Sequence, residues 1–220
     1  MAIQIQKAVR AKSKLRLGLA SPSGGGKTYS ALVLAKGLTS DGTLEKVCVI
    51  DTESGSANLY AHLGDYSTIQ LDPNNVTSEI VIESFAVAET AGFEVIIFDS
   101  STHRWEWVLN QNDKIAQQMY NNSFAAWRKT NKYYDAVIKK FLGSPCHVII
   151  TSRKKQEYVV GQDDRGRSTV TKLGLKDVQR DGLEYELTTV FNLDMNHLAT
   201  ATKDRTGIFM DAEPFMITEE

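Results

Sequence analysis

The residues Ser21-Pro22-Ser23-Gly24-Gly25-Gly26-Lys27-Thr28 nearly match the phosphate-binding pattern G-x-x-x-x-G-K-[ST], with serine in place of the first glycine. An apolar segment, 15–20, precedes this loop, and helix-like residues, 28–38, follow it. Consecutive glycines let backbone N–H groups surround phosphate oxygens, and the N-terminus of a helix adds partial positive charge. The pattern predicts a nucleotide site formed by Ser23, Gly24, Gly25, Gly26, Lys27, Thr28 and Tyr29. The alternative is a glycine-rich turn that ends in Lys-Thr by chance.

Within this loop, Lys27 is expected to reach the β- and γ-phosphates of ATP, and the Thr28 hydroxyl to ligate Mg²⁺. Ser21 stands at the start of the loop, where glycine would leave the backbone freer. We expect the serine to lower nucleotide affinity without removing a phosphate contact.

Two acidic residues follow short apolar runs and are candidates for the same chemistry. Asp99 ends the run VIIFD, and an acid at the tip of a buried strand beside the phosphate loop would hold Mg²⁺ through water. Glu53, in VIDTESG, lies just past another run, where it could polarise the attacking water. The alternatives are a strand-end cap for Asp99 and an ordinary loop residue for Glu53.

Lys203 and Arg205 form a second cationic group at the end of a predicted strand. Residues two apart on a strand point to the same side. Fixed cations near a γ-phosphate stabilise the charge of the transition state, in their own subunit or in a neighbouring one. The alternative is a surface cluster of charges.

The elements that must position these residues alternate along the chain. Apolar runs at 15–20, 47–51, 67–71, 95–99 and 147–151 are separated by helical spacing at 28–38, 76–91 and 125–142. Nearly continuous apolar strands separated by helices predict an α/β fold with a mostly parallel sheet covered on both faces. Ligands bind such sheets outside the carboxyl ends of the strands. Residues 158–160, 168–171, 184–194 and 197–203 alternate in strand fashion and predict antiparallel strands added at the C-terminal side.

The length of 220 residues fits a single domain, 1–220, with a basic N-terminal arm at 1–14 and an acidic tail at 210–220. The net charge of −2 does not by itself indicate a nucleic-acid-binding protein. No apolar run is long enough to span a membrane, and the first residues lack the features of a secretory signal. We therefore expect no membrane partner and a cytoplasmic location, with Cys48 and Cys146 as buried thiols.

The ordered segments SPSGGGKTYSAL, VIDTESGSANLY, VIIFDSSTHRW, HVIITSRKKQEYV, VQRDGLEYEL and TKDRTG resemble a phage-encoded family of RecA-like P-loop ATPases that includes single-strand annealing proteins. The resemblance runs from about Leu15 to Phe209. It implies a RecA-like core, ATP with Mg²⁺, assembly into a homo-oligomeric ring or filament, and single-stranded DNA as partner. A single-strand-binding protein is a further candidate partner, and the location would be the cytoplasm of a bacterial host.

Position by position, the resemblance assigns the phosphate loop to Lys27 and Thr28, the metal-associated acid to Asp99 and the catalytic glutamate to Glu53. It makes Lys203 and Arg205 the cations that act across a subunit interface. It places a polar residue that senses the γ-phosphate at Thr151 and Ser152, of which Ser152 is the weaker assignment. The family usually has glycine where this chain has Ser21.

The same resemblance implies DNA contacts in the loops after the strands that end at Asp99 and Thr151. The candidate residues are Arg104, Trp105, Arg153, Lys154, Lys155, Arg165, Arg167 and Lys172. Cations follow phosphates and aromatic rings stack on bases, and residues 153–181 hold eight basic against five acidic side chains. Trp105 and Trp107 are two apart and cannot share one helix face, so we expect one to be buried and one to lie near the loop.

Two other functions remain open from the sequence. The first is a P-loop ATPase that acts on protein partners without DNA, which the near-neutral charge permits. The second is a nucleotide-gated annealing module with little turnover, which Ser21 permits.

Overall fold

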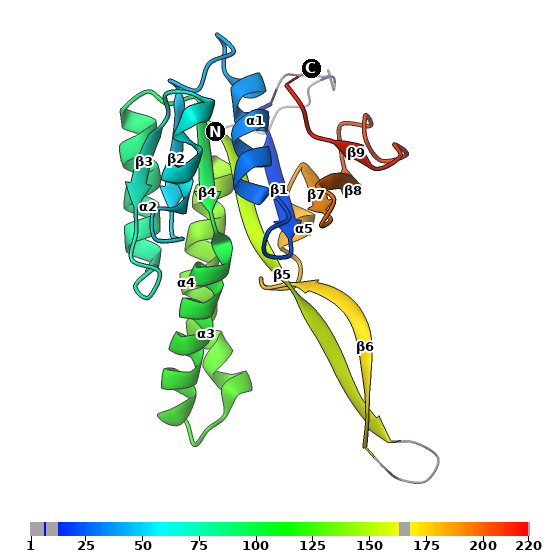
Figure 1. Cartoon of the computed structure of the whole chain (residues 1–220). Helices are drawn as coiled ribbons and strands as arrows, with labels where there is room; N and C mark the ends of the chain where they lie inside the picture. Colours follow the sequence, from blue (N-terminus) through cyan, green and yellow to red (C-terminus); the bar gives the residue numbers. More distant parts are fainter. Residues whose placement is uncertain (1–6, 8–12, 163–167, 220) are drawn as a thin grey trace.

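The computed structural model describes residue 7, residues 13–162 and residues 168–219 (Figure 1). Its central elements are a sheet, four long helices and two short helical segments. In chain order they are β1 (Arg16–Ser21), α1 (Lys27–Leu38), β2 (Val47–Asp51), the 3-10 helix η1 (Ser56–Leu63), β3 (Ser67–Gln70), α2 (Ser78–Thr90), β4 (Val95–Asp99), α3 (Ser101–Gln117), α4 (Ser123–Gly143), β5 (His147–Gln162), β6 (Ser168–Asp177), α5 (Leu183–Glu186), β7 (Thr189–Leu193), β8 (Leu198–Asp204) and β9 (Phe215–Met216).

The strands of the described chain form one sheet in the order β3-β2-β4-β5-β1-β7-β8-β9, and β6 pairs with β5. In this spatial order, each neighbouring pair from β3 through β2, β4, β5 and β1 to β7 is parallel. The pairs β7–β8, β8–β9 and β5–β6 are antiparallel. The predicted α/β fold, with a mostly parallel sheet and antiparallel strands added at the C-terminal side, is therefore confirmed.

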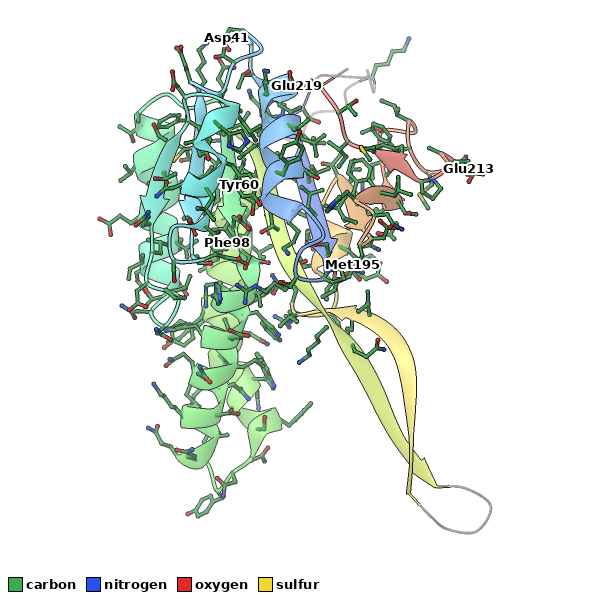
Figure 2. All side chains as sticks on the ribbon, in the orientation of Figure 1. Asp41, Tyr60, Phe98, Met195, Glu213 and Glu219 are labelled. Carbon is green, nitrogen blue, oxygen red and sulfur yellow. The ribbon has the colours of Figure 1, made fainter. Side chains whose placement is uncertain are left out.

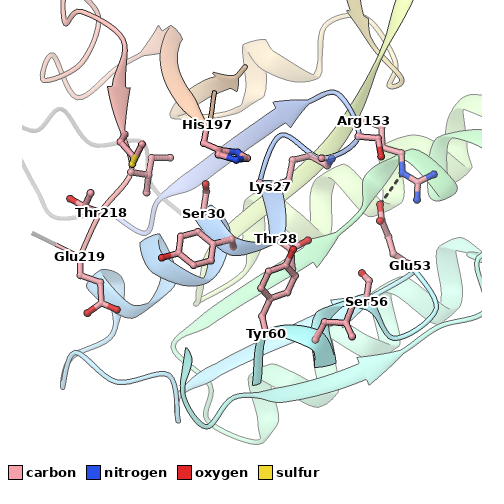
Figure 3. A pocket seen from close by; sticks show the side chains of 17 residues that line it. Lys27, Thr28, Ser30, Glu53, Ser56, Tyr60, Arg153, His197, Thr218 and Glu219 are labelled. Atoms are coloured by element: carbon pink, nitrogen blue, oxygen red, sulfur yellow. Dashed lines mark hydrogen bonds and ion pairs between the residues drawn. The ribbon is translucent and has the colours of Figure 1, made fainter. Parts of the chain in front are cut away.

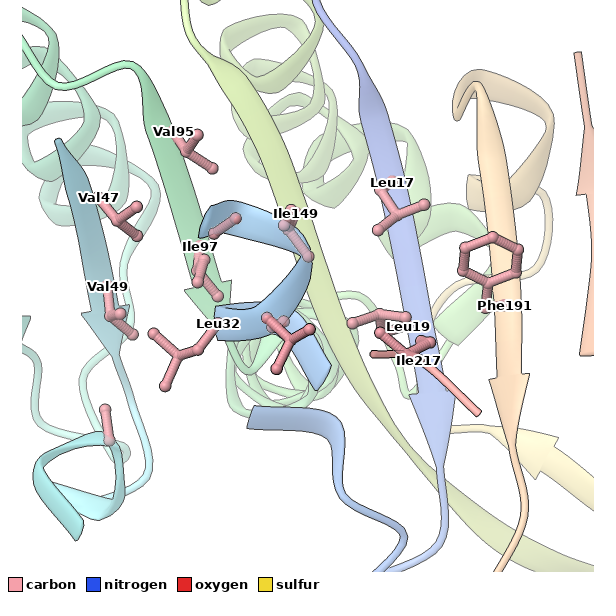
Figure 4. Close-up of a cluster of buried hydrophobic side chains, with 14 of the residues drawn as sticks. Leu17, Leu19, Leu32, Val47, Val49, Val95, Ile97, Ile149, Phe191 and Ile217 are labelled. Carbon is pink, nitrogen blue, oxygen red and sulfur yellow. The ribbon is translucent and has the colours of Figure 1, made fainter. Parts of the chain in front are cut away.

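Both faces of the parallel strands are apolar because each face is covered by helices. In β4, Val95 and Ile97 join the cluster under α1, whose Leu32 is fully buried (Figure 4). Ile96 and Phe98 point to the other face, where Phe85 of α2 packs against them. Phe98 lies inside the molecule, whereas Asp41 and Glu213 lie at its outer edge (Figure 2). This two-sided burial explains why the strands have continuous apolar sequences.

Helix α3 is absent from the sequence-based prediction, which expected a DNA-binding loop after Asp99. The helix begins at Ser101, directly after β4. Its buried positions include Arg104 and Asn112 as well as Val108 and Ala116, so polar residues interrupt the apolar spacing. The Asn112 side chain donates to Ser123 Oγ and accepts from Thr130 Oγ1, which joins α3 to α4. Hydrogen bonds between helices thus replace part of the apolar packing that sequence patterns detect.

Two projections extend from the end of the sheet where β4 and β5 finish their parallel pairing (Figure 1). One is the helical pair α3–α4, and the other is the long hairpin formed by β5 and β6. The expected strand at 147–151 is the first part of β5, which continues to Gln162 because β6 pairs with its second half.

The C-terminal residues belong to the domain over their described part. Phe215–Met216 pairs with β8 as β9, and Ile217 is buried in the cluster under α1. Glu219 forms an ion pair with Lys36 of α1 at 2.7 Å. The predicted acidic tail at 210–220 therefore packs against the domain at residues 215–217 and 219. Across the described residues, no helix has both the length and the apolar character needed to cross a membrane.

Candidate nucleotide site

The phosphate loop connects β1 to α1 at the carboxyl end of the sheet. Gly24 and Gly26 have φ angles of 83° and 82°, which residues with a side chain rarely adopt. Gly26 caps α1, so the unpaired N–H groups of the first helical turn face the space in front of the loop. This arrangement offers several backbone donors and the positive end of a helix to an anion.

Lys27 is the first residue of α1 and only 9% exposed. Its Nζ has two long contacts, 3.4 Å to Ser21 Oγ and 3.5 Å to the Pro22 carbonyl oxygen. Burial lowers the pKa of Lys27, an effect that the negative charges of Glu53 and Asp99 partly offset. Within the part of the chain that the structure describes, Lys27 forms no ion pair. A buried ammonium group without a carboxylate partner is costly, and an anionic ligand would supply the missing charge.

Asp99 lies beside the loop at the tip of β4 and is fully buried. Its carboxylate accepts hydrogen bonds from Thr28 Oγ1 at 2.6 Å and from Thr151 Oγ1. Burial raises the pKa of Asp99, and the two hydroxyl donors oppose that rise. Thr28 and Asp99 are thus close enough for their oxygens to reach one metal ion.

Glu53 faces the same space from the segment after β2 (Figure 3). Its Oε1 accepts a hydrogen bond from Arg153 Nε at 2.9 Å, which is also an ion pair. Burial raises the pKa of Glu53, but the hydrogen bond and charge of Arg153, helped by Ser100 and by the charge of Lys27, more than offset it and hold the pKa below its usual value. Glu53 is therefore ionised and fixed in direction. Arg153 reaches it because β1 and β5 pair Ser21 with Arg153.

These residues line a cavity of about 780 Å³. Beyond the loop, the cavity continues between Tyr29, Leu59 and Tyr60 on one side and the C-terminal residues 216–219 on the other. The rings of Tyr29 and Tyr60 lie 6.5 Å apart. Ser23 and Gly24 of the phosphate loop also line the cavity, so the predicted residues Ser23 and Tyr29 both border it.

The residues present fit ATP and Mg²⁺. Lys27 and the amides of 24–28 match a triphosphate, because the ammonium group is buried and has long contacts only. The Thr28 hydroxyl and the Asp99 carboxylate are oxygen donors, which Mg²⁺ prefers. A cavity of this size holds a drug-sized ligand, and two tyrosines at its outer part offer apolar surface to a base.

The structure corrects one assignment that depended on position in a strand, that of Ser152. Ser152 lies on the opposite face of β5 from Asp99 and lines a small cavity with Leu187 and Val190. Thr151, one residue earlier, makes the contact with Asp99. Because side chains alternate along a strand, only one of the two residues can face the site.

Lys203 and Arg205 lie away from the phosphate loop of their own chain. Lys203 pairs with Val190, and Val190 pairs with Gly18, three residues before the end of β1. Their side chains donate hydrogen bonds to the carbonyl oxygens of α5, including a shared bond to Tyr185 O at 2.7 Å each. The structure thus does not bring these cations together with Lys27.

The residues predicted to contact DNA lie in several different environments. Arg104 is 4% exposed, and its Nη2 donates to Ser78 Oγ and to the Tyr133 carbonyl oxygen, so its assignment to DNA is wrong. Arg153 belongs to the nucleotide cavity through Glu53, not to a DNA loop. Lys154 is paired with Asp177 at 3.1 Å, while Lys155 is exposed.

The remaining predicted contacts are Trp105, Arg165, Arg167 and Lys172. Trp105 stacks on Trp127 at 5.8 Å, and Trp107 packs edge-on against Tyr133, so both tryptophans lie half-buried against α4. The expectation that one would be buried and the other near a loop is wrong. Arg165 and Arg167 lie outside the described residues, and for Lys172 the structure describes only the backbone, in β6.

Several residues that line the cavity belong to no sequence motif and were not predicted. Tyr60, His197 and residues 216–219 reach it from η1, from the turn between β7 and β8, and from the end of the chain. His197 Nδ1 lies 3.1 Å from the point where a side chain at Gly26 would begin. Only the packing of distant elements brings these residues to the loop.

A glycine loop between the first strand and the first helix, a buried lysine and a strand-end acid in contact with the loop threonine define the class of P-loop nucleotide-binding proteins. Residues 13–214 match the AAA domain family, so the chain belongs to that family. No curated protein matches the sequence.

Among solved structures, the chain is similar to a KaiC-like protein of the hyperthermophilic archaeon Pyrococcus horikoshii. The sequences are 15% identical, the TM-score is 0.55, and the match covers 93% of this chain and 86% of the other. This likeness establishes the RecA-like fold. Family and fold together support a P-loop ATPase domain.

Proposed function

We propose that the protein hydrolyses ATP and binds single-stranded DNA, in recombination or annealing, as a homo-oligomer. The observation that carries the nucleotide part is the buried Lys27, whose ammonium group faces a large cavity without an ion pair in the described chain. Family membership supports the same chemistry.

Each residue of the site has a role in the hydrolysis. Lys27 and the amides of the loop bind the phosphates and stabilise the charge that develops on the γ-phosphate. Glu53 orients the attacking water and accepts its proton, and Arg153 keeps Glu53 ionised and pointed at the cavity. Mg²⁺ held by Thr28 and Asp99 would neutralise phosphate charge.

Assembly would complete the site. Lys203 and Arg205 are remote from the phosphate loop of their own chain. Arg205 is exposed and Lys203 is partly exposed, at the end of β8. In a ring or filament, they would meet the nucleotide of a neighbouring subunit. They would then exchange their hydrogen bonds with α5 carbonyl groups for bonds to phosphate.

The DNA part is supported by the position of the two projections. Helix α3 begins two residues after Asp99, and the second half of β5 begins directly after Thr151 and Arg153. The α3–α4 segment, 101–143, carries seven Lys and Arg residues against three Asp and Glu residues in a chain of net charge −2. Both projections therefore start at the nucleotide site, and one of them attracts anions.

Steady-state ATP hydrolysis at fixed moderate salt, with and without a long unstructured single-stranded oligonucleotide, tests the proposal. We expect a rate that the oligonucleotide stimulates and that Lys27→Ala abolishes. A rate indifferent to DNA would favour an ATPase that acts on protein partners. Annealing that persists in Glu53→Gln, with no turnover in the wild type, would favour the nucleotide-gated annealing module.

A further inference from the structure

A groove of about 620 Å³ lies between the α3–α4 pair and the base of the β5–β6 hairpin, separate from the nucleotide cavity. One wall carries aromatic side chains from the helices, together with Leu109 and Asn131. The other is formed by Lys155 and residues 176–181, whose cations stand beside the carboxylates of Asp177 and Asp181. We call the set Trp105, Phe124 and Trp127 the aromatic wall, and the set Lys155, Lys176 and Arg180 the basic edge.

The aromatic wall offers ring surface to a ligand. Trp105 and Trp127 stack with an interplanar angle of 16°, and both are partly exposed. Phe124 is 88% exposed, which is unusual for a large apolar side chain on a helix. These rings come from two helices whose mutual position is fixed by the Asn112 hydrogen bonds. A rigid aromatic surface of this kind suits flat ligands that stack.

The basic edge offers cations that can change partner at low cost. Lys155 is exposed. Lys176 pairs with Asp181 at 3.2 Å, and Arg180 pairs with Asp135 at 3.7 Å, but both carboxylates are more than half exposed. Exposed ion pairs contribute little to stability, so phosphate can replace these carboxylates. Arg180 also lies 4.8 Å above the ring of Tyr134, which holds its guanidinium group beside the groove.

We infer that this groove binds single-stranded DNA, with unpaired bases stacked on the aromatic wall and phosphates along the basic edge. The inference rests on the proposed function for its partner and assigns the place of binding. Stacking platforms beside a basic track bind single strands without reading sequence. Base faces in a duplex are covered by their neighbours, so the aromatic wall would exclude double-stranded DNA.

The groove and the nucleotide cavity are linked by strand β5. Lys155 is two residues after Arg153, which holds Glu53. Strand β5 therefore carries one residue of each site, and a strand of DNA bound at Lys155 acts on the same segment as the nucleotide. This link explains why DNA would stimulate hydrolysis.

Quenching of intrinsic tryptophan fluorescence by an unstructured oligothymidine, at several salt concentrations, tests the inference on the full chain. We expect Trp127→Ala to weaken binding about tenfold or more, the effect of losing one stacked base. The matched control is Trp107→Ala, which removes the same ring from outside the groove and should leave affinity within about twofold, since it loses no stacked base. ATP binding and the melting temperature of each variant show whether it folds.

A second pair of variants does not depend on the helix packing. Lys155→Ala should reduce the slope of log K against log salt by about 0.7, the value for one phosphate contact on a single strand. Lys129→Ala, at an exposed position of α4 outside the groove, is its control and should not change the slope.

The outcomes separate the groove from the proposed function. If the wild type binds DNA and neither Trp127→Ala nor Lys155→Ala affects that binding, the groove is not the DNA site. The DNA function would still stand. No binding by the wild type would overturn both. Quenching by polyglutamate but not by oligothymidine would also overturn the inference and assign the groove to an acidic protein segment.

Discussion

Replacing Gly25 with alanine should destabilise the protein because Ser21 occupies the space that the new methyl group needs. A Cβ atom on Gly25 would lie 2.7 Å from Ser21 Oγ and 2.8 Å from Ser21 Cβ. The hydroxyl cannot easily turn away, since it donates to the Pro22 carbonyl oxygen at 2.7 Å, and Cβ is fixed by the backbone. Serine at position 21 therefore leaves room for glycine but not for a larger residue at position 25.

The size of the effect follows from the contacts. Overpacking a well-packed site typically costs about 1–3 kcal/mol, which we expect for Gly25→Ala alone. Ser21→Gly removes both atoms of the clash and leaves only the Asp194 carbonyl oxygen at 3.2 Å, which a shift of a few tenths of an ångström relieves. The double variant should therefore recover part of the loss, with a coupling energy of about 1 kcal/mol or more, inside the range for residues in contact.

Urea unfolding of the wild type, both single variants and the double variant measures this coupling. Gly37→Ala is the control, because no atom beyond its chain neighbours and its own helix backbone lies within 4 Å of its new methyl group. As an open helical position, it should gain up to about 1 kcal/mol. If Gly25→Ala costs the same free energy with serine and with glycine at position 21, the steric argument is refuted.

Three further changes test other parts of the structure. Arg153→Gln removes the group that holds the pKa of Glu53 down and leaves the effect of burial, so the acid limb of the pH profile of kcat/KM should move to higher pH; an unchanged limb would remove Glu53 from the reaction. Arg104→Met should lower the free energy of unfolding by about 1–3 kcal/mol through lost hydrogen bonds to Ser78 and Tyr133. The salt slope of oligonucleotide binding should not change with it, and a smaller slope would return Arg104 to the DNA site. Burial raises the pKa of Asp204, but hydrogen bonds from Thr206, Phe209 and Ile208 more than offset it and hold the pKa below its usual value. The stability it adds is present above the ordinary aspartate pKa of about 3.9 and is lost as pH falls below it. Asp204→Asn should therefore make urea midpoints depend less on pH between pH 5 and 3, and equal pH dependence in both proteins would contradict this.

Local sequence was sufficient for the strands and for the phosphate loop. Strands buried on both faces need continuous apolar residues, so β2 and β4 could be placed to the residue, and Asp51 and Asp99 mark their ends. Helix α3 could not be found in the same way, because Arg104 and Asn112 occupy buried positions and hydrogen bonds join it to α4. Where a buried position carries a polar side chain that bonds to the neighbouring helix, the apolar period of α3 is interrupted.

For the site, local sequence identified Lys27, Thr28, Asp99 and Glu53 because their chemistry depends on the ends of strands and the start of a helix. It did not show that Arg153 holds Glu53, that Thr151 rather than Ser152 contacts Asp99, or that residues 216–219 line the cavity. Those contacts join residues that are from 52 to about 190 positions apart in the chain. They are set by the register of β5 beside β1 and β4 and by the return of the chain end to α1. The sequence by itself determined which backbone can bind phosphate, since that is a property of a few consecutive residues. Only the tertiary structure decided which side chains from other strands face that phosphate site, since that depends on how whole elements pack.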